Sequence, residues 1–151
     1  MDGGARGNPG PAGFGVHVAD EAGAEVAALY GFLGHTTNNV AEYAALLALL
    51  EHAATLQPRH LTVRSDSQLL IRQMLGEYRV KDERLKRLYT EAKRLAARLN
   101  VIRFEHVPRE ENRDADALAN RAMDEQAGNT PVPKALADLL GPAPTGRLPG
   151  I

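Results

Sequence analysis

The chain has 151 residues, of which 44% are hydrophobic and 25% are charged, and its formal net charge is −1. This length and composition are typical of one soluble domain and exclude extensive disorder and fibrous classes. The absence of cysteine excludes disulfide scaffolds, thiolate zinc sites and cysteine nucleophiles. The apolar runs are too short to cross a bilayer and no signal-peptide pattern opens the chain. We therefore expect a cytoplasmic monomer with no membrane partner.

Hydrophobic periodicity predicts strands first and then helices that alternate with strands. Apolar residues that alternate with small or polar ones are typical of a half-buried strand, and recurrence every three or four positions indicates an amphipathic helix. In chain order, the expected elements are strands at 14–18 and 25–33, a helix at 40–56, a strand at 61–63, helices at 67–75 and 82–100, a strand at 101–107 and a helix at 112–127. Asn38 or Asn39 is the expected N-cap of the first helix. The glycine-rich residues 2–13 cannot form a helix.

This order of elements predicts an α/β fold. A strand meander followed by crossovers through helices implies a mixed sheet with helices packed on it. Beyond Gly128 the sequence turns to prolines and glycines, and within it only residues 134–140 are suited to a helical turn or two. We therefore expect one domain over 1–127 and a flexible Pro/Gly-rich tail over 128–151.

Four carboxylates fall at the boundaries between these elements. They are Asp2 in the glycine-rich segment, Glu42 in the first turn of the first helix, Asp66 after a strand, and Asp116, near Asp114, at the start of the last helix. Ligands bind in the crevice at the strand ends of an open sheet, where converging acids repel one another unless cations neutralise them. Carboxylate oxygens suit Mg²⁺ or Mn²⁺ rather than zinc. In nucleases such clusters hold two metal ions.

Each acid also has a purely structural interpretation. Glu42 fits a capping box with Asn39. The acids at the other two helix starts fit N-caps or favourable positions beside the helix dipole, and Asp2 fits a solvated terminal residue. Taken one at a time, the structural interpretation is the commoner one, so the case for chemistry depends on their joint context.

That context resembles a known family. Four segments are similar to the four motifs of type 1 ribonuclease H, in the family's order and with similar spacing: 2–15 (DGGARGNPGPAGFG), 36–42 (TTNNVAE), 65–68 (SDSQ) and 106–120 (HVPREENRDADALAN). The resemblance covers roughly residues 2–127. It implies a ribonuclease H-like five-stranded mixed sheet, with an antiparallel meander followed by parallel strands and flanking helices.

The resemblance also implies the residues of the site. The four metal-binding carboxylates match Asp2, Glu42, Asp66 and Asp116, which would hold two Mg²⁺ ions, with Mn²⁺ as a possible substitute. His106 matches a loop histidine that assists catalysis or product release, and an ordinary strand-end histidine is the alternative interpretation.

An enzyme that acts on RNA–DNA hybrids must sense 2′-hydroxyl groups, which requires small neutral groups that donate and accept hydrogen bonds. Side chains of this kind lie near the acids in sequence: Asn8, Asn38, Asn39 and Gln68. Their structural alternatives are turn and cap positions. Thr37 resembles a family residue that contacts the DNA backbone.

Charge is distributed unevenly along the chain. Residues 79–98 hold eight basic and three acidic side chains, which gives this segment a charge of +5. Such a stripe is typical of a surface that faces a phosphate backbone, and the alternative is a solvated helix with pairs such as Glu83–Arg87. Residues 78–85 are too few for the separate basic helix of longer family members, so the chain resembles the handle-less form.

Only Met1 precedes Asp2, whereas the family has several apolar residues before its first acid, so we expect upstream residues in the natural chain.

The leading hypothesis is an endoribonuclease that cleaves the RNA strand of RNA–DNA hybrids with two metal ions and leaves 3′-hydroxyl and 5′-phosphate ends. One alternative is a hybrid- or double-stranded-RNA-binding module with weak or no hydrolysis because the first strand is short. Another is a different nuclease on the same scaffold, such as a resolvase of branched DNA.

Overall fold

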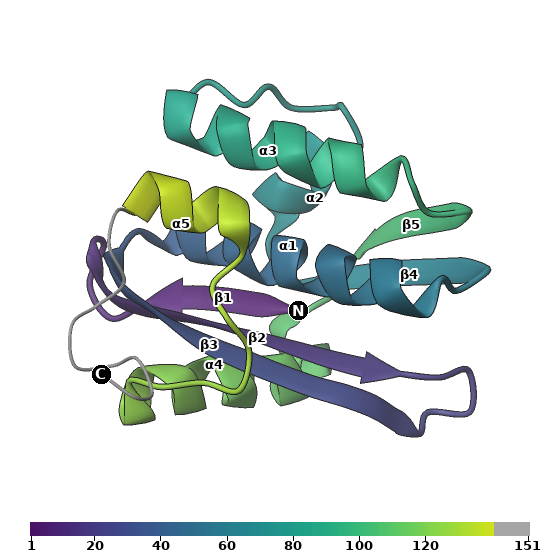
Figure 1. Ribbon diagram of the computed structural model, residues 1–151, viewed down its shortest axis with the longest axis horizontal. Coiled ribbons are helices and arrows are strands. Elements are labelled where there is room, and N and C mark those ends of the chain that lie inside the picture. The colour runs from purple at the N-terminus through teal and green to yellow at the C-terminus, as the bar shows by residue number, and fades with distance from the viewer. Residues whose placement is uncertain (141–151) are drawn as a thin grey trace.

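The computed structural model describes residues 1–140, and Figure 1 shows how their elements are layered. In chain order these elements are β1 (Asp2–Ala5), β2 (Gly10–Ala19), β3 (Glu25–Thr36), α1 (Asn38–Leu56), β4 (His60–Ser65), α2 (Gln68–Met74), α3 (Glu83–Ala96), β5 (Val101–His106), the 3₁₀ turn η1 (Arg109–Glu111), α4 (Arg113–Glu125) and α5 (Lys134–Leu140). Helix α4 covers one face of the sheet, α1 covers the other, and α3 packs on the outer side of α1. None of the helices within residues 1–140 is long and apolar enough to cross a membrane.

The five strands form two hydrogen-bonded ladders. Strands β1, β2 and β3 are antiparallel neighbours in that order, with Asp2 opposite Gly15. Strands β4 and β5 pair in parallel. The Met1 nitrogen donates to the carbonyl oxygen of Arg64 at 2.9 Å and so joins the two ladders. The expected α/β class, with a meander followed by parallel strands and flanking helices, is confirmed.

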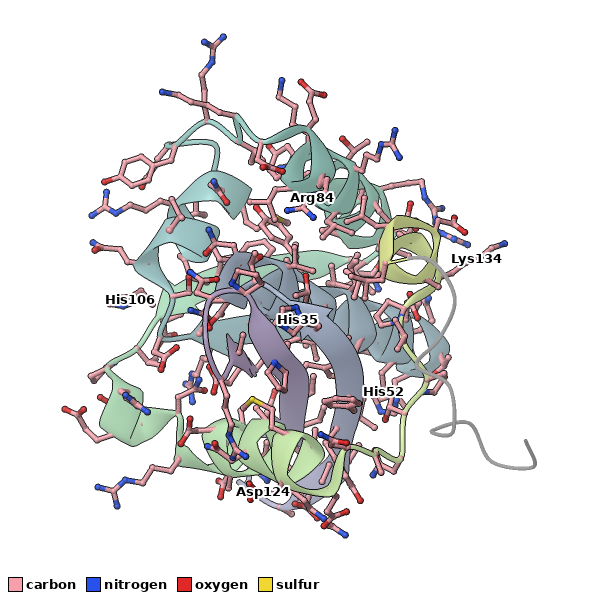
Figure 2. The ribbon with its side chains drawn as sticks, turned by 90° about the vertical axis from the view of Figure 1, so that its left-hand side faces the viewer. His35, His52, Arg84, His106, Asp124 and Lys134 are labelled. Atoms are coloured by element: carbon pink, nitrogen blue, oxygen red, sulfur yellow. The ribbon has the colours of Figure 1, made fainter. Side chains whose placement is uncertain are left out.

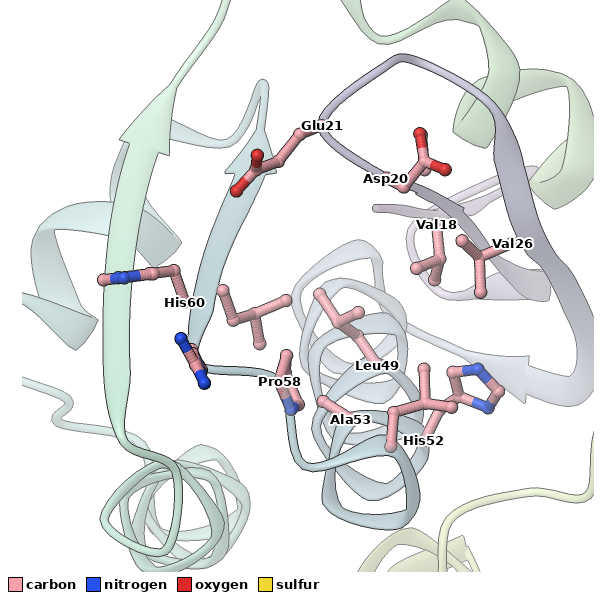
Figure 3. Close-up of a pocket in the computed structure, with 13 residues that line it drawn as sticks. Val18, Asp20, Glu21, Val26, Leu49, His52, Ala53, Pro58 and His60 are labelled. Carbon is pink, nitrogen blue, oxygen red and sulfur yellow. The ribbon is translucent and has the colours of Figure 1, made fainter.

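A groove of about 560 Å³ separates the two ladders on the far side of Met1 (Figure 3). Its walls are the end of β2, the turn after it and the start of β4, and its floor is the C-terminal half of α1. The groove exists because β1 has four residues and β2 has ten, so the last part of β2 extends past its partner. The groove lies at the C-terminal end of α1 and the N-terminal end of β4. Glu42 and Asp66, which the sequence singles out, lie at the opposite ends of these two elements.

Helix α1 is buried on almost every side, which differs from the amphipathic helix that its periodicity predicted. Eleven of its 19 residues are buried, because it lies between the sheet and α3 rather than at the surface. A helix enclosed in this way is apolar all round. Helix α3 is the amphipathic one, with Leu88, Ala92 and Leu95 buried beneath a charged outer face.

Glycine in β2 allows α4 to approach the sheet closely. A Cβ atom at Gly15 would overlap the carbonyl oxygen of Ala115 and the backbone nitrogen of Ala119 in α4. We expect Gly15→Ala to lower the free energy of unfolding, measured with urea, by about 2 kcal/mol or more, because helix and strand must separate. The matched control is Gly4→Ala in β1, where the nearest atom to a new Cβ is the Met123 methyl carbon at 3.9 Å. A Gly4→Ala loss as large as that of Gly15→Ala would contradict this account.

Residues 128–140 pack against the domain. The Asn129 side chain donates to the carbonyl oxygen of Ala28 at 2.8 Å and accepts from the Tyr30 nitrogen at 2.9 Å. Further along, Leu136 in α5 is fully buried in the core and α5 lies against α3. Helix α5 spans the residues 134–140 that were expected to suit a helical turn or two, while the flexibility expected of 128–151 stays a prediction. Residues 141–151 of that expectation fall outside the described residues.

Candidate active site

Three of the predicted acids converge where β1, α1 and the end of β4 meet. Asp2, Glu42 and Asp66 each contribute a carboxylate oxygen, and these three oxygens lie within 4.8 Å of one another. Like charges this close repel strongly when they are shielded from water. The structure therefore brings together three residues that are separated by 40 and 24 positions in the sequence.

The structural interpretation of Glu42 as part of a capping box does not hold. The N-cap of α1 is Thr37, whose hydroxyl accepts from the Val40 nitrogen at 3.3 Å. Neither Asn38 nor Asn39 caps the helix, so the expected caps were wrong by one or two positions. Glu42 instead accepts a hydrogen bond from the backbone of Gly3 in β1, and thus its carboxylate points toward the other acids.

The interpretation of Asp66 as an N-cap also fails. Helix α2 is capped by Ser67, whose hydroxyl accepts from the Leu70 nitrogen at 3.3 Å. The Ser67 nitrogen itself donates to the hydroxyl of Ser65 at 3.0 Å. Because these serines satisfy the turn between β4 and α2, the carboxylate of Asp66 is left to serve the acidic cluster.

Burial and mutual repulsion hold protons on two of the acids. The pKa of Glu42 is raised to about 9, first by burial and then by the negative charges of Asp2 and Asp66. The pKa of Asp2 is raised to about 7 by burial, by the charge of Asp66 and by a hydrogen bond to the Asp116 carboxyl. The cluster therefore favours any species that brings positive charge into it.

Asp116, rather than Asp114, lies beside this cluster. The Asp116 carboxyl is within hydrogen-bonding reach of Asp2, and its side chain is 34% exposed. The Asp114 side chain is 78% exposed and lies 3.8 Å from a ring nitrogen of His17. The geometry thus agrees with the choice of Asp116 as the fourth acid, while the role of each acid stays a prediction.

The donor set fits a hard divalent cation. The Oε2 atom of Glu42 is buried and has no hydrogen-bond partner within residues 1–140. A buried polar atom without a partner is costly, and a cation that displaces the Glu42 proton would satisfy this oxygen. The groups that would surround such an ion, Asp2, Glu42 and Asp66, are all carboxylates, the ligands that Mg²⁺ and Mn²⁺ favour. A divalent metal site is therefore the simplest explanation of this arrangement.

The amide side chains predicted to contact substrate first fix the glycine-rich loop. The Asn38 side-chain oxygen accepts from the Ala5 nitrogen at 2.8 Å, and that of Asn8 accepts from the Asn38 nitrogen at 3.1 Å. The Gln68 side-chain oxygen, in the orientation that satisfies its neighbours, accepts from Arg72 at 3.1 and 3.2 Å. The NH₂ groups remain as donors, and because an amide oxygen has two lone pairs, the expectation that these side chains both donate to and accept from the substrate stays a prediction. Asn39 is exposed on the first turn of α1.

His106 ends β5 (Figure 2), and its Nε2 atom lies 3.3 Å from the carbonyl oxygen of Asp66. The structure thus places this predicted residue at the border of the acidic cluster.

Two residues near the cluster were not singled out from the sequence. Arg109 in η1 has a guanidinium nitrogen 4.0 Å from the Asp116 carboxylate, and Asn112 is buried at the start of α4. Both fall inside the fourth motif, but nothing in their spacing indicates a role.

Five of the eight basic residues of the segment 79–98 lie on α3, and the other three flank it. Its ion pairs are Lys86–Glu83 and Arg94–Glu91, and the side chain of Asp82 caps the helix. The three acids of this segment are therefore engaged locally, and the excess of basic groups faces solvent. The Glu83–Arg87 pair that was considered from the sequence is replaced by a pair between Glu83 and Lys86.

Residues 1–122 match the family described as reverse transcriptase-like, and the chain belongs to that family. It is 46% identical over 128 residues to a bifunctional protein of Mycobacterium tuberculosis, in a match that covers 83% of this chain and 35% of that protein. The solved N-terminal RNase H domain of the mycobacterial protein superimposes with a TM-score of 0.79 at 45% identity, and covers 82% of this chain and 95% of that one.

A second solved structure is LC11-RNase H1, which was isolated from compost by a metagenomic approach. Its crystal structure in complex with an RNA/DNA hybrid has a TM-score of 0.79 at 42% identity, and covers 83% of this chain and 94% of that one. The resemblance to type 1 ribonuclease H that the four motifs suggested is confirmed by these similarities.

Proposed function

We propose that the protein is an endoribonuclease that hydrolyses the RNA strand of RNA–DNA hybrids. The observation that carries the proposal is the convergence of Asp2, Glu42 and Asp66, with a buried oxygen on Glu42 that has no hydrogen-bond partner in the described part of the chain. Such an arrangement is costly to fold and is useful to a protein that binds metal ions. The similarity to a protein solved with an RNA/DNA hybrid supports this choice of substrate.

In this proposal Asp2, Glu42, Asp66 and Asp116 hold two Mg²⁺ ions, for which Mn²⁺ can substitute. When bound, the ions supply the positive charge that turns water into a nucleophile and offsets the charge on the leaving oxygen. Water adds to the phosphorus and the bond to the 3′ oxygen breaks, which leaves 3′-hydroxyl and 5′-phosphate ends. The place of His106 beside Asp66, with its Nε2 atom 3.3 Å from the Asp66 carbonyl oxygen, suits it to assist product departure.

The proposed substrate contacts follow from which atoms remain free. Asn8, Asn38 and Gln68 present NH₂ donors, so we expect the 2′-hydroxyl groups and base edges of the hybrid to act as acceptors toward them. Thr37 and Asn39 lie on the same turn at the start of α1. The exposed basic face of α3 adds a sequence-independent attraction for phosphates that weakens as salt is raised.

The test is to incubate end-labelled RNA–DNA hybrid, duplex DNA, duplex RNA and a four-way DNA junction with the protein, in Mg²⁺ and in EDTA. We expect cleavage of the hybrid RNA strand alone, only with metal, and with 3′-hydroxyl and 5′-phosphate ends. Tight hybrid binding without cleavage, even at high Mn²⁺, would instead indicate a binding module. Cleavage of the junction in preference to the hybrid would indicate a resolvase.

A further inference from the structure

Asn112 is a buried side chain at the start of α4 whose hydrogen bond is unusual for its position. It is 6% exposed and stands at the N-cap. Asparagine at an N-cap ordinarily accepts from a backbone N–H two or three residues ahead, but the side chain of Asn112 makes no capping bond. Its Nδ2 atom instead donates to the carbonyl oxygen of Met1 at 2.9 Å, across 111 positions of sequence. The amide therefore joins the start of α4 to Met1, the residue directly before strand β1.

The two ends of this bond each lead to an acid of the site. Met1 directly precedes Asp2, and the backbone oxygen of Asn112 accepts from the Asp116 nitrogen at 3.0 Å. The Met1 nitrogen in turn donates to the carbonyl oxygen of Arg64 in β4. The backbone beside Asp2 is thus held from two sides, by β4 and by the start of α4.

A neutral amide is well suited to this link. The carboxyls of Asp2 and Asp116 lie within hydrogen-bonding reach and repel each other when both are charged. A carboxamide fixes the backbone segments that carry them and adds no charge. An aspartate at position 112 would direct an acceptor at the Met1 carbonyl oxygen, and a serine is too short to reach it.

We propose that Asn112 is a positioning residue that sets the separation of Asp2 and Asp116 and thereby the affinity for divalent metal. The inference rests on the proposed function only in taking these acids as metal ligands. Groups that orient metal ligands from outside the coordination sphere change metal affinity by about 10–100-fold when they are replaced.

The test is Asn112→Ser in the full chain, with Mn²⁺ binding measured by calorimetry in the absence of nucleic acid. Serine retains a hydroxyl that can cap α4 and loses the bond to Met1. We expect the Kd for Mn²⁺ to rise about 10-fold or more, and the Mg²⁺ concentration that half-saturates hybrid cleavage to rise in parallel. The Kd for hybrid is expected to stay within about twofold. Asn112→Gln, which keeps the carboxamide on a longer stem, is expected to lose less affinity than serine.

The matched control is Asn129→Ser, which removes an amide-to-carbonyl bond of 2.8 Å between residues 101 positions apart, outside the acidic cluster. We expect it to lower thermal stability and to leave the Mn²⁺ affinity unchanged. Equal losses of Mn²⁺ affinity in the two serine variants, or a Kd for Asn112→Ser within twofold of the parent, would overturn the inference. The parent protein could also bind Mn²⁺ without cleaving the hybrid, which would contradict the proposed function. In that case a weaker Mn²⁺ affinity in Asn112→Ser would still support the positioning role of Asn112.

Discussion

Asp66→Asn is expected to lower the rate of hybrid cleavage by about 1000-fold or more at saturating Mg²⁺. The asparagine keeps the shape of the side chain but lacks the charge that binds a cation, and metal stabilisation of the transition state is worth several kcal/mol. The fold is expected to stay intact, because Ser67 and not Asp66 caps α2. Steady-state cleavage of a labelled hybrid and thermal melting in EDTA measure the two effects separately.

The matched control for this prediction is the pair Asp116→Asn and Asp114→Asn. Both acids lie in the first turn of α4, so either change alters the charge beside the helix terminus equally. Only Asp116 lies next to Asp2, and therefore only Asp116→Asn is expected to reduce cleavage strongly, with Asp114→Asn within about twofold of the parent. Full activity in Asp66→Asn, or a large loss in Asp114→Asn, would contradict the assignment of the acids.

Each of the four acids could be placed near the boundary of a predicted element, but none could be told from a structural acid by itself. Asp66, for example, closely follows the strand predicted at 61–63 and precedes a predicted helix, and only the joint occurrence of the four motifs indicated that these side chains converge at the strand ends. The failure of the predicted N-cap is local. Thr37 and Asn38 can both cap a helix, and Asn38 is occupied by the Ala5 nitrogen. Which of two capable neighbours caps α1 is decided by the loop that packs against it.

The contacts that could not be predicted are those between distant segments. The partner of Asn112 lies 111 positions away, and the sequence around Asn112 indicates only a helix start. The prolines near residue 131 indicate a break in regular structure, whereas the packing of that stretch depends on Asn129 and Leu136 meeting surfaces built by β3 and the core. Composition alone does not reveal such surfaces, since it carries no information on what a loop lies against.

The metal-free protein is expected to lose stability as the pH rises from about 5 to about 9. The pKa values of Asp2 and Glu42 are raised to about 7 and about 9 in the folded chain, from 3.8 and 4.5. Acids that bind protons more tightly when folded stabilise the protein fully below their unfolded pKa, and this contribution is lost as the pH rises through the folded pKa. Thermal melting in EDTA at pH 5, 7 and 9 measures the decline.

Glu42→Gln is expected to remove most of this decline. At pH 8 without metal it should raise the free energy of unfolding by roughly 2–4 kcal/mol, because the cost of ionising a buried carboxyl beside Asp2 and Asp66 disappears. Mg²⁺ should stabilise the parent protein against unfolding but should not stabilise Glu42→Gln. In the parent, the increase in stability on adding Mg²⁺ should grow with pH, since the metal competes with protons for the same oxygens.

The control for this experiment is Glu21→Gln, which removes a glutamate from the exposed turn between β2 and β3, away from the acidic cluster. Its melting temperature in EDTA should decline with pH as steeply as that of the parent, and Mg²⁺ should stabilise it equally. A parent whose metal-free stability stays level from pH 5 to 9 would show that the cluster is solvated and already ionised. In that case the buried oxygen of Glu42 would no longer indicate a metal site, because the folded protein would already tolerate the negative charge of Glu42.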